Sequence, residues 1–509
     1  MKKLISFIFI FIVFFSIPSA RGSDTLFENL YQKKFTLDGK NIPLVSIGLF
    51  TGISSVRISS EKGLEIGTST IGGIRLSVDK EILLQLTHGK KGEIEFWIAL
   101  EDMPLTDWSE SKKYSYKVKM IEHGYLIAMK GKMLDTRRAL PSIGPFKSRE
   151  EARKKLEVIS KKWERAYIHS KLKTLPEGHF TARPVNNTFS LKYATALAFF
   201  PGKTGRLTVR SGNETIIVSG TVIVTLDSDG KLAVINELPV ETYLEGILPS
   251  EMWPSAPMEA LKAQAIAARG QVLAKMGTRH MTDPFHLCRK VHCQAYGGKL
   301  HASTSAACRA TAGLVLFETQ STVVDTVYHS SCGGHTENNE NAWGGIPKKT
   351  LRGRSDLLSG KLPKFWSHHV TRPQSAWCKK GNPSFRWKST ISLKDLARNL
   401  STIGFNRTIT RIEVIKRGIS GRITALRVFS GKKSTEIKGE LVIRKLFGNL
   451  KSSMFIHRFT PTEIEFTGAG FGHGVGMCQW GAINRAKAGQ NYKTILSHYY
   501  YGSILKKLY

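Results

Sequence analysis

A single carboxylate, Glu251, stands in a short apolar turn between Pro249 and Pro254. A carboxylic acid held rigidly at the boundary of a structural element can donate a proton to a leaving oxygen and later take a proton back. The neighbouring Met252 and Trp253 can desolvate this carboxyl group and raise its pKa, whereas the N-terminus of a following helix would lower that pKa. Acid catalysis requires the effect of burial to prevail, and a solvated loop glutamate is the alternative interpretation.

The segment HMTDPFHLCRKVHC, which covers residues 280–293, contains several cysteines and histidines close together. Cys288, His292 and Cys293 are ligand types that bind zinc. We take His280 as the fourth ligand, with His286 as the other choice. The competing interpretation is a disulfide between the two cysteines, which an oxidising compartment would favour. A zinc ion with four protein ligands would be structural, because catalytic zinc keeps an open position.

A glycine-rich segment near the C-terminus reads GAGFGHGVGMCQWGA and covers residues 468–482. Its glycine spacing fits neither the G-x-G-x-x-G pattern nor the Walker pattern, which disfavours phosphate binding. Glycines at alternate positions let a backbone pass close to a ligand or to another strand. His473, Gln479 and Trp480 are therefore candidate ligand contacts. A packed hairpin is the alternative for His473, and core packing is the alternative for Trp480.

The longest helical pattern in the chain directly follows Glu251. Its apolar residues recur at the spacing of one buried stripe, and they are Leu261, Ala265, Ala268, Val272 and Met276. We expect Ser255 to cap this helix, Pro257 to stand in its first turn and Gly277 to end it. The pattern predicts a buried helix that can hold the preceding turn rigidly.

Strand patterns fill much of the remaining chain. Residues 43–60 are typical of a strand pair, and four short strands between 206 and 236 predict a small antiparallel sheet. Ser148 and Glu151 form a capping box ahead of a further helix, and the final third returns to strands before a helix at about 482–488. We therefore expect a multi-domain α+β protein with mixed or antiparallel sheets packed around the long central helix.

The composition is that of a globular protein with an unusual charge. The 509 residues are 41% apolar and 23% charged, and this length is too great for a single hydrophobic core. The formal net charge is +35, from 75 Lys and Arg against 40 Asp and Glu. Such a charge favours an anionic neighbour, which could be nucleic acid, anionic lipid or a cell-wall polymer.

The N-terminus resembles a secretory signal. Two lysines precede an apolar run over residues 4–17, and small residues follow that permit cleavage after Gly22. An uncleaved N-terminal anchor is the alternative. We expect export to the periplasm or cell envelope, which removes nucleic acid as a partner. Disulfides are the default expectation for the six cysteines of an exported protein, with Cys332 and Cys378 as one candidate pair.

Several motifs follow one another in the second half of the chain. They read VINELPVETYLEGILPSEM, PMEALKAQAIAAR, CQAYGG, YHSSCGGHTE, GAGFGHGVGMCQWGAINRAKAG and ILSHYYYG, and they cover roughly residues 230–345 and 440–503. This series resembles the stage II sporulation protein D/LytB family of peptidoglycan enzymes. The resemblance implies a lytic transglycosylase that cuts the bond between N-acetylmuramic acid and N-acetylglucosamine and closes a 1,6-anhydro ring. It places the single acid and base of that reaction on Glu251.

The same resemblance implies further residues and partners. The substrate would be peptidoglycan glycan strands from which an amidase has removed the peptides, and some family members place a zinc ion at the cysteine and histidine cluster. The expected glycan contacts are Tyr328, His329, Ser330, His335, His473, Gln479 and Trp480, with Glu337 as a weaker candidate. The alternative function is a non-catalytic wall-binding protein that enhances an N-acetylmuramoyl-L-alanine amidase.

The segment from about 120 to 172 resembles part of a SPOR repeat, a small βα module that binds glycan strands stripped of their stem peptides. The match covers about half of such a module, and an unrelated βα unit is the alternative. We expect a signal peptide over 1–22, an N-terminal α+β region over 23–180 that includes this segment, and a catalytic domain over 188–509.

Overall fold

The computed structural model describes residues 24–509 apart from 71–74, 79, 109–117, 164, 186–189, 194, 203–204, 360–369 and 372–374. The expected signal peptide lies outside the described residues. Sheets and helices alternate along the chain, and the described sheets are antiparallel except where β1 pairs with β20 and β22 pairs with β29. The predicted α+β class with mixed and antiparallel sheets is confirmed.

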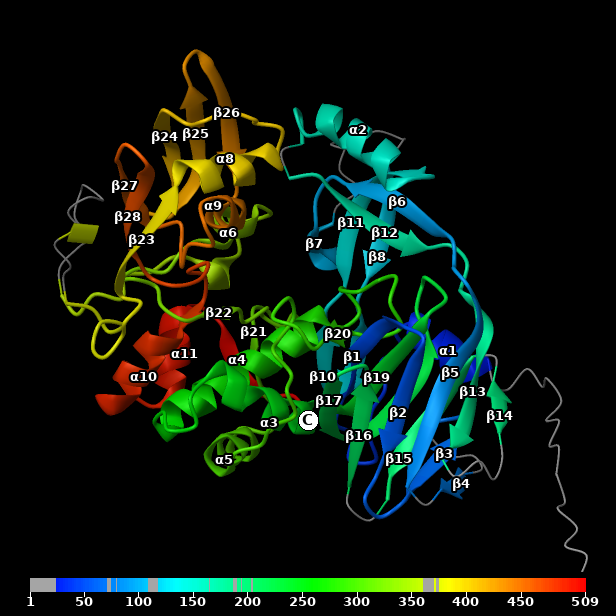
Figure 1. Cartoon of the computed structure of the whole chain (residues 1–509). Helices are drawn as coiled ribbons and strands as arrows, with labels where there is room; N and C mark the ends of the chain where they lie inside the picture. Colours follow the sequence, from blue (N-terminus) through cyan, green and yellow to red (C-terminus); the bar gives the residue numbers. More distant parts are fainter. Residues whose placement is uncertain are drawn as a thin grey trace, which may run out of the picture.

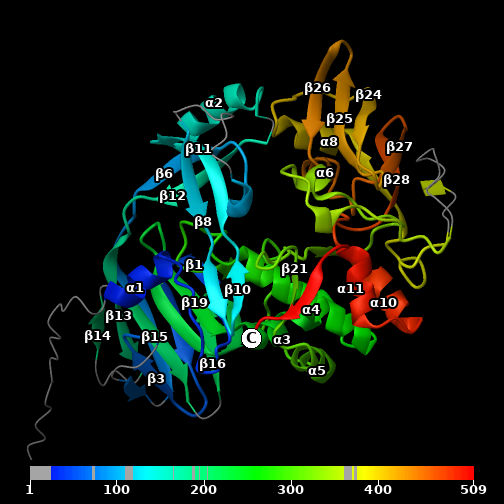
Figure 2. The same cartoon turned by 180° about the vertical axis from the view of Figure 1, so that it is seen from behind.

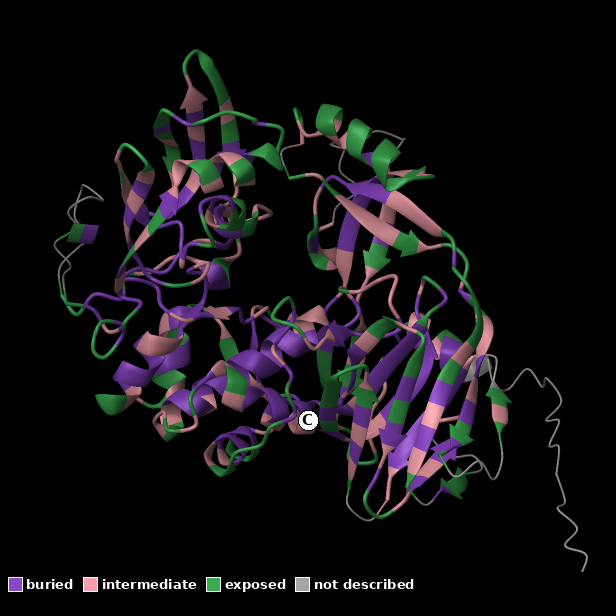
Figure 3. Ribbon diagram, in the orientation of Figure 1, coloured by how far each residue is buried: buried purple, intermediate pink, exposed green. Residues whose placement is uncertain are grey.

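Helix α4 (Met258–Lys275) lies at the centre of the molecule (Figure 1). All five residues of the predicted stripe are buried in one hydrophobic core, and residues on the opposite side, such as Ile266, are buried in a second core. Figure 3 shows buried residues along most of the helix. Gly277 follows the helix with a φ of +70°, as expected for a glycine that ends a helix.

The N-terminal boundary of α4 differs from the prediction. Pro257 is the N-cap residue, with extended backbone angles, and Met258 is the first helical residue, so Ser255 does not cap the helix. A residue that precedes proline is disfavoured in the α conformation. Ala256, which precedes Pro257, therefore stays outside the helix, and Ser255 cannot be its N-cap residue.

Two β-sheets share the larger core with α4. The first has the order β20-β1-β19-β18-β15-β3-β4, and the second has the order β14-β13-β5-β2-β16-β17. The strands of the first are β1 (Leu44–Ile53), β3 (Leu64–Gly67), β4 (Arg75–Val78), β15 (Ala196–Pro201), β18 (Thr221–Leu226), β19 (Leu232–Pro239) and β20 (Leu287–Cys288). Those of the second are β2 (Ser55–Ser59), β5 (Glu81–Lys90), β13 (Glu177–Pro184), β14 (Leu191–Tyr193), β16 (Arg206–Ser211) and β17 (Glu214–Ser219).

Residues 43–60 do form two strands, but β1 and β2 do not pair with each other. Strand β1 pairs with β19 in the first sheet and β2 pairs with β5 in the second, so the prediction of a strand pair is wrong. Gly52 has a φ of +72° where the chain leaves the first sheet. Both sheets contain strands that come before residues 180–188 and strands that come after them. The boundary that we expected there, between the N-terminal region and the catalytic domain, therefore does not separate two hydrophobic cores.

A small lobe follows the first strands and carries the SPOR-like segment. Its sheet contains β6 (Ile94–Ala99), β7 (Met103–Pro104), β8 (Lys119–His123), β11 (Arg138–Phe146) and β12 (Tyr167–Leu172). The hairpin of β9 (Leu126–Met129) and β10 (Lys132–Asp135) extends from this lobe to the larger core, in which Met129 and Leu134 are buried. Helix α2 (Arg149–Ile159) packs on this sheet, and the Ser148 hydroxyl accepts a hydrogen bond from the Glu151 N–H at 3.1 Å. The Ser148 cap is confirmed, whereas the Glu151 carboxylate accepts the Lys147 N–H in place of the Ser148 N–H that a full capping box requires.

Another lobe is formed late in the chain. It contains β23 (Arg386–Ser392), α8 (Leu393–Ser401), β24 (Arg411–Arg417), β25 (Ile423–Ser430), β26 (Lys433–Lys438), α9 (Glu440–Leu446), β27 (Phe455–Phe459) and β28 (Glu463–Ala469). It has its own hydrophobic core. In Figure 1 this lobe and the lobe with α2 lie on the same side of the central helices.

The described fold also contains shorter helices and strands. They are α1 (Asp24–Tyr31), α3 (Val240–Glu251), α5 (Ala302–Ala310), β21 (Leu314–Phe317), β22 (Tyr328–His329), α6 (Asn339–Trp343), β29 (Met477–Cys478), α10 (Gln479–Lys487), α11 (Tyr492–Tyr499) and β30 (Ile504–Lys507). Helices α3, α5, α10 and α11 contact α4 directly. Figure 2 shows the C-terminus of the chain beside α3.

Candidate active site

Glu251 is the last residue of α3, and the turn that follows it comprises residues 252–257. The expected position in a turn is therefore wrong by a few residues, because α3 continues through Pro249 to its end. The C-terminal end of a helix carries partial negative charge, which disfavours an ionised carboxylate. Helix α3 therefore favours a higher pKa of Glu251, whereas the helix N-terminus that we expected beside Glu251 would have lowered that pKa.

The carboxyl group of Glu251 has few polar neighbours. Its Oε1 accepts a hydrogen bond from the Ala295 N–H at 3.2 Å, and the Tyr328 hydroxyl also bonds to the carboxyl group. Burial is the largest effect and raises the pKa of Glu251, while these two hydrogen bonds and the charge of Lys275 oppose that rise in part. The net rise in pKa favours a carboxyl group that holds its proton, as a general acid must.

The backbone of Glu251 is fixed from the other side by the glycine-rich segment. The Gln479 side-chain amide donates to the Glu251 carbonyl oxygen at 2.7 Å and lies 3.3 Å from Gln264 Oε1. The Gln294 amide donates to Gln271 Oε1 at 2.9 Å and to the Tyr328 hydroxyl at 3.2 Å. These contacts join α3, α4 and two of the sequence motifs into one polar network.

Sequence reasoning missed the glutamines of α4 and the Gln294 and Ala295 contacts. Gln264 and Gln271 stand seven residues apart on this helix, so they lie on one face of it. Two buried amides at this spacing were a usable signal, since buried polar groups require partners. The Ala295 N–H offered no signal, because a backbone donor carries no residue type.

Two tryptophans form an aromatic pair next to Glu251. The rings of Trp253 and Trp480 meet edge to face with centroids 4.8 Å apart, and Trp253 is 53% exposed. Met252, in contrast, is buried. Of the two neighbours expected to desolvate the carboxyl group, Met252 is directed into the core and Trp253 faces solvent. An exposed aromatic pair beside a buried acid offers a face on which a sugar ring can pack.

The histidines predicted as substrate contacts bind backbone groups of the sequence motifs, and His329 joins two different motifs. The Nδ1 atoms of His329 and His335 lie 3.0 Å from the Val475 carbonyl and 2.6 Å from the Thr336 carbonyl, respectively. His473 Nδ1 accepts the Val475 N–H at 3.0 Å. Its ring packs against Trp343 with centroids 4.7 Å apart.

The structure therefore divides the predicted contacts into two groups. Tyr328 and Gln479 touch Glu251, and Trp480 lies beside the turn that follows it. Ser330 contributes its backbone carbonyl, which accepts the Trp480 N–H at 3.1 Å. The histidine side chains hold the surrounding loops together.

The rival carboxylates are held by other partners. Glu241 forms two hydrogen bonds with the buried Arg269 at 2.9 and 2.7 Å, and Glu245 and Glu259 pair with Arg309 and Lys262. Glu337 is 1% exposed and accepts hydrogen bonds from backbone and side-chain groups around Ser420 and Asn341. The prediction that Glu337 contacts substrate is wrong, since the carboxylate is fully occupied inside the fold.

The predicted metal ligands converge in the structure. One ligand atom from each of His280, Cys288, His292 and Cys293 lies within 4.8 Å of all the others. The His280 Nε2 to Cys293 Sγ distance is 3.3 Å, and His292 Nδ1 lies 3.7 and 3.5 Å from the sulfurs of Cys288 and Cys293. Asp283 Oδ2 binds His280 Nδ1 at 2.9 Å, which directs Nε2 toward the thiols. Both cysteines are free thiols, and two thiols with two imidazoles are a donor set that suits tetrahedral zinc.

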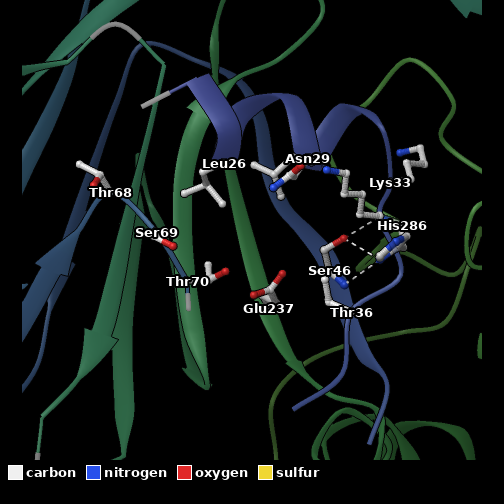
Figure 4. A pocket seen from close by; sticks show the side chains of 12 residues that line it. Leu26, Asn29, Lys33, Thr36, Ser46, Thr68, Ser69, Thr70, Glu237 and His286 are labelled. Atoms are coloured by element: carbon white, nitrogen blue, oxygen red, sulfur yellow. Dashed lines mark hydrogen bonds between the residues drawn. The ribbon is translucent and has the colours of Figure 1, made fainter. Parts of the chain in front are cut away.

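His286, the other choice for the fourth ligand, lies elsewhere. Its Nδ1 is 2.8 Å from Ser46 Oγ and its Nε2 is 3.1 Å from the Tyr125 hydroxyl. Figure 4 shows His286 directed toward Ser46 at the side of a pocket of about 160 Å³ that Lys33 and Glu237 also line. Because the His286 ring is held there, His280 is the imidazole that completes the cluster.

None of the helices within the described residues is both long and apolar enough to cross a membrane.

Comparison with known proteins agrees with the arrangement of the motifs. Residues 228–317, which include α3 and α4, match the family model described as stage II sporulation protein. Residues 367–476, which include the late lobe with β23 to β28, match a domain of unknown function (DUF8618). The first match contains Glu251 and the four predicted metal ligands.

Three curated relatives are similar over about half of this chain. An uncharacterized protein of Brachyspira hyodysenteriae is 30% identical over 276 residues, which is 53% of this chain and 67% of the relative. The amidase enhancer of Bacillus subtilis is 30% identical over 297 residues, or 52% of this chain and 40% of the relative. Stage II sporulation protein D of Bacillus amyloliquefaciens is 27% identical over 286 residues, or 53% and 74% of the two chains. The chain belongs to the stage II sporulation protein D/LytB family.

Proposed function

We propose that this protein is an exported lytic transglycosylase that cleaves peptidoglycan glycan strands with Glu251 as its single acid and base. The observation that carries the proposal is a buried carboxyl group of raised pKa, held by Ala295, Tyr328 and the carbonyl contact of Gln479. Membership of the family supports a role in cell-wall processing. We infer the reaction and its substrate from the resemblance to the family, and the buried acid is what supports that inference in the structure.

One carboxyl group is sufficient for this reaction. A hydrolase normally pairs two carboxylates around the scissile bond. Four other glutamates of the matched motifs, Glu241, Glu245, Glu259 and Glu337, each have partners of their own. A mechanism with a single acid fits this arrangement better than one that requires a second carboxylate.

The proposed cycle conserves its protons. Glu251 gives its proton to the glycosidic oxygen as the bond to the muramyl C1 breaks, which leaves an ionised carboxylate. The carboxylate then takes the proton of the muramyl C6 hydroxyl, whose oxygen bonds to C1 and closes the 1,6-anhydro ring. The Tyr328 and Ala295 hydrogen bonds favour the ionised form between the two steps, and the carboxyl group ends the cycle protonated.

The charge of the protein favours glycan that has lost its peptides. Removal of a stem peptide by an amidase frees the lactyl carboxylate of each muramyl residue, so the stripped strand is a polyanion. A chain with a formal charge of +35 attracts such a strand at long range. We propose the same ligand for the SPOR-like segment, whose sheet and helix α2 form a separate lobe.

The product identifies the reaction. Purified protein is incubated with peptide-stripped glycan strands and, in parallel, with intact peptidoglycan, and the products are analysed by mass spectrometry. We expect 1,6-anhydromuramyl ends, in larger yield from the stripped strands. Reducing muramyl ends would show a hydrolase, and intact strands with folded protein would exclude the enzyme.

The pH dependence reports the protonation of Glu251. The acid must be protonated to begin the reaction, so activity is lost as pH rises through the pKa of Glu251, and a raised pKa extends activity to higher pH than an ordinary glutamate allows. Tyr328→Phe removes a hydrogen bond that stabilises the ionised form, so we expect the alkaline limb of kcat/KM to move to higher pH. A limb that stays in place in the Tyr328→Phe variant would contradict this role of Tyr328.

We also propose that His280, Cys288, His292 and Cys293 hold a structural zinc ion. These residues lie between the end of α4 and Ala295, so the metal would fix the segment that presents the Ala295 N–H to Glu251. We expect the Cys288→Ser/Cys293→Ser variant to lose one zinc ion per chain and to unfold at lower temperature. Elemental analysis and thermal unfolding measure both effects, and Cys308→Ser, which removes a buried cysteine outside the cluster, is the control. An unchanged zinc content would refute the site.

A second function is supported by the likeness to the amidase enhancer of Bacillus subtilis. The protein would then bind the wall and stimulate an N-acetylmuramoyl-L-alanine amidase without cutting glycan itself. Stimulation of a purified amidase by the Glu251→Gln variant, together with the absence of anhydro ends from the unmodified protein, would favour this function.

A further inference from the structure

A second group of ligand-type side chains lies outside the sites described so far. Cys332, Asp356, Cys378 and Cys478 place one ligand atom each within 4.8 Å of all the others, and each of the four residues is 0% exposed. The Cys332 sulfur lies 3.4 Å from the Cys378 sulfur and 3.4 Å from Asp356 Oδ2. The four residues come from segments that are far apart in sequence.

The sulfurs of this buried cluster accept hydrogen bonds from the backbone. The Cys332 and Gly481 N–H groups point at the Cys478 sulfur at 3.2 and 3.4 Å, and the Gly334 N–H points at the Cys332 sulfur at 3.4 Å. Cys478 is also the N-cap residue of α10, so its sulfur lies at the positive end of a helix. N–H donors and a helix N-terminus stabilise a thiolate.

The aspartate of the cluster is oriented by groups outside it. Arg485 Nη2 and the Tyr499 hydroxyl donate to Asp356 Oδ1 at 2.9 and 3.0 Å. The other oxygen, Oδ2, is left facing the thiols. Ligating carboxylates are commonly held in this way, with one oxygen hydrogen-bonded and the other free to coordinate.

We propose that Cys332, Asp356, Cys378 and Cys478 bind a second zinc ion. A tetrahedral site with zinc–sulfur bonds of about 2.3 Å has sulfur–sulfur edges of about 3.8 Å, a few tenths of an ångström longer than the contact between Cys332 and Cys378. Thiolates are soft ligands that select zinc over magnesium or calcium. Four protein ligands and full burial leave no open position, so this zinc is structural.

The alternative is a disulfide between Cys332 and Cys378. It would bring the two sulfurs to about 2.05 Å and leave Asp356 and Cys478 facing a neutral bridge. Asp356 would keep its contact with Arg485, but its Oδ2 and the Cys478 sulfur, which accepts two N–H groups, would face no cation. The zinc site accounts for all four side chains at once.

The second zinc ties three parts of the chain together. It joins the loop after β22, the segment that begins the late lobe, and the end of β29. Cys478 directly precedes Gln479, which binds the Glu251 carbonyl, so the metal holds one wall of the candidate active site. The proposal does not depend on the reaction assigned to Glu251.

The test uses the full chain with the first cluster removed. The Cys288→Ser/Cys293→Ser variant is purified in zinc-containing buffer under reducing conditions, and its metal content is measured by elemental analysis and native mass spectrometry. We expect one zinc ion per chain, which is lost on the further change Cys378→Ser and retained on the further change Cys308→Ser. A zinc content of zero in the first variant, or one that Cys378→Ser leaves unchanged, overturns the proposal.

Two further measurements cover the case in which Cys378→Ser does not fold. Cobalt added to the Cys288→Ser/Cys293→Ser variant reports thiolate ligands through its charge-transfer and visible d–d bands, and we expect the bands of a tetrahedral, thiolate-rich site. Their absence overturns the proposal. A peptide containing a Cys332–Cys378 disulfide in protein purified without reductant from an exporting host also overturns it.

Discussion

Replacing Glu251 by glutamine is expected to lower the rate of anhydromuramyl end formation by about 10²–10⁴-fold, the usual contribution of a general acid. Glutamine has nearly the same shape and retains the backbone carbonyl that Gln479 binds, but its amide has no proton of suitable acidity to give the leaving oxygen. The amide can still accept the Ala295 N–H. The loss should therefore appear in kcat, with little change in strand binding. Quantification of anhydro ends against time by mass spectrometry measures it.

Glu245→Gln is the matched control for this experiment. Glu245 stands on the same helix, six residues earlier, and its carboxylate lies 3.4 Å from a largely exposed Arg309. We expect the Glu245→Gln variant to keep the rate of the unmodified protein. Full cleavage by the Glu251→Gln variant would reject Glu251 as the acid while leaving the reaction class open.

The site could be located from sequence because its parts are local. The apolar period of α4, the stop at Gly277 and the close spacing of Cys288, His292 and Cys293 are all short-range patterns. The structure contains all three features, because each depends on the helix period or on neighbours within a few residues. The direction of the shift in the pKa of Glu251 could not be predicted in this way, because apolar neighbours and an expected helix N-terminus act in opposite directions, and burial in the fold decides it.

Other features depend on contacts that no local pattern contains. Pro249 has the sequence signature of a helix breaker, yet α3 continues through it to Glu251, although residue 249 has no N–H to donate to the Glu245 carbonyl. The choice between His280 and His286 is made by Ser46, which lies 240 residues from His286 in sequence and binds its ring. The cluster around Asp356 likewise joins residues up to 146 positions apart, so spacing alone could not reveal it.

Glu241→Gln is expected to destabilise the fold by about 3–5 kcal/mol, the usual cost of leaving one partner of a buried ion pair without its counter-charge. The Arg269 side chain is 0% exposed and receives both oxygens of Glu241, which also accept the Gly313 N–H and the Tyr509 hydroxyl. Arg269 stands on α4 and Glu241 on α3, so the pair fixes the helix that ends in Glu251 against the central helix. Urea unfolding followed by circular dichroism measures the free energy of unfolding.

The control for this change is again Glu245→Gln, because Glu245 lies one helical turn from Glu241 and its partner is exposed. An exposed pair contributes about 0–1 kcal/mol, so the two variants should differ by several-fold in their effect on stability. A double variant, Glu241→Met/Arg269→Met, removes both charges and should recover part of the loss. Equal stabilities of the Glu241→Gln and Glu245→Gln variants would show that water reaches Arg269. The rigid support that Glu251 requires would then have to come from Gln479 and Ala295 alone.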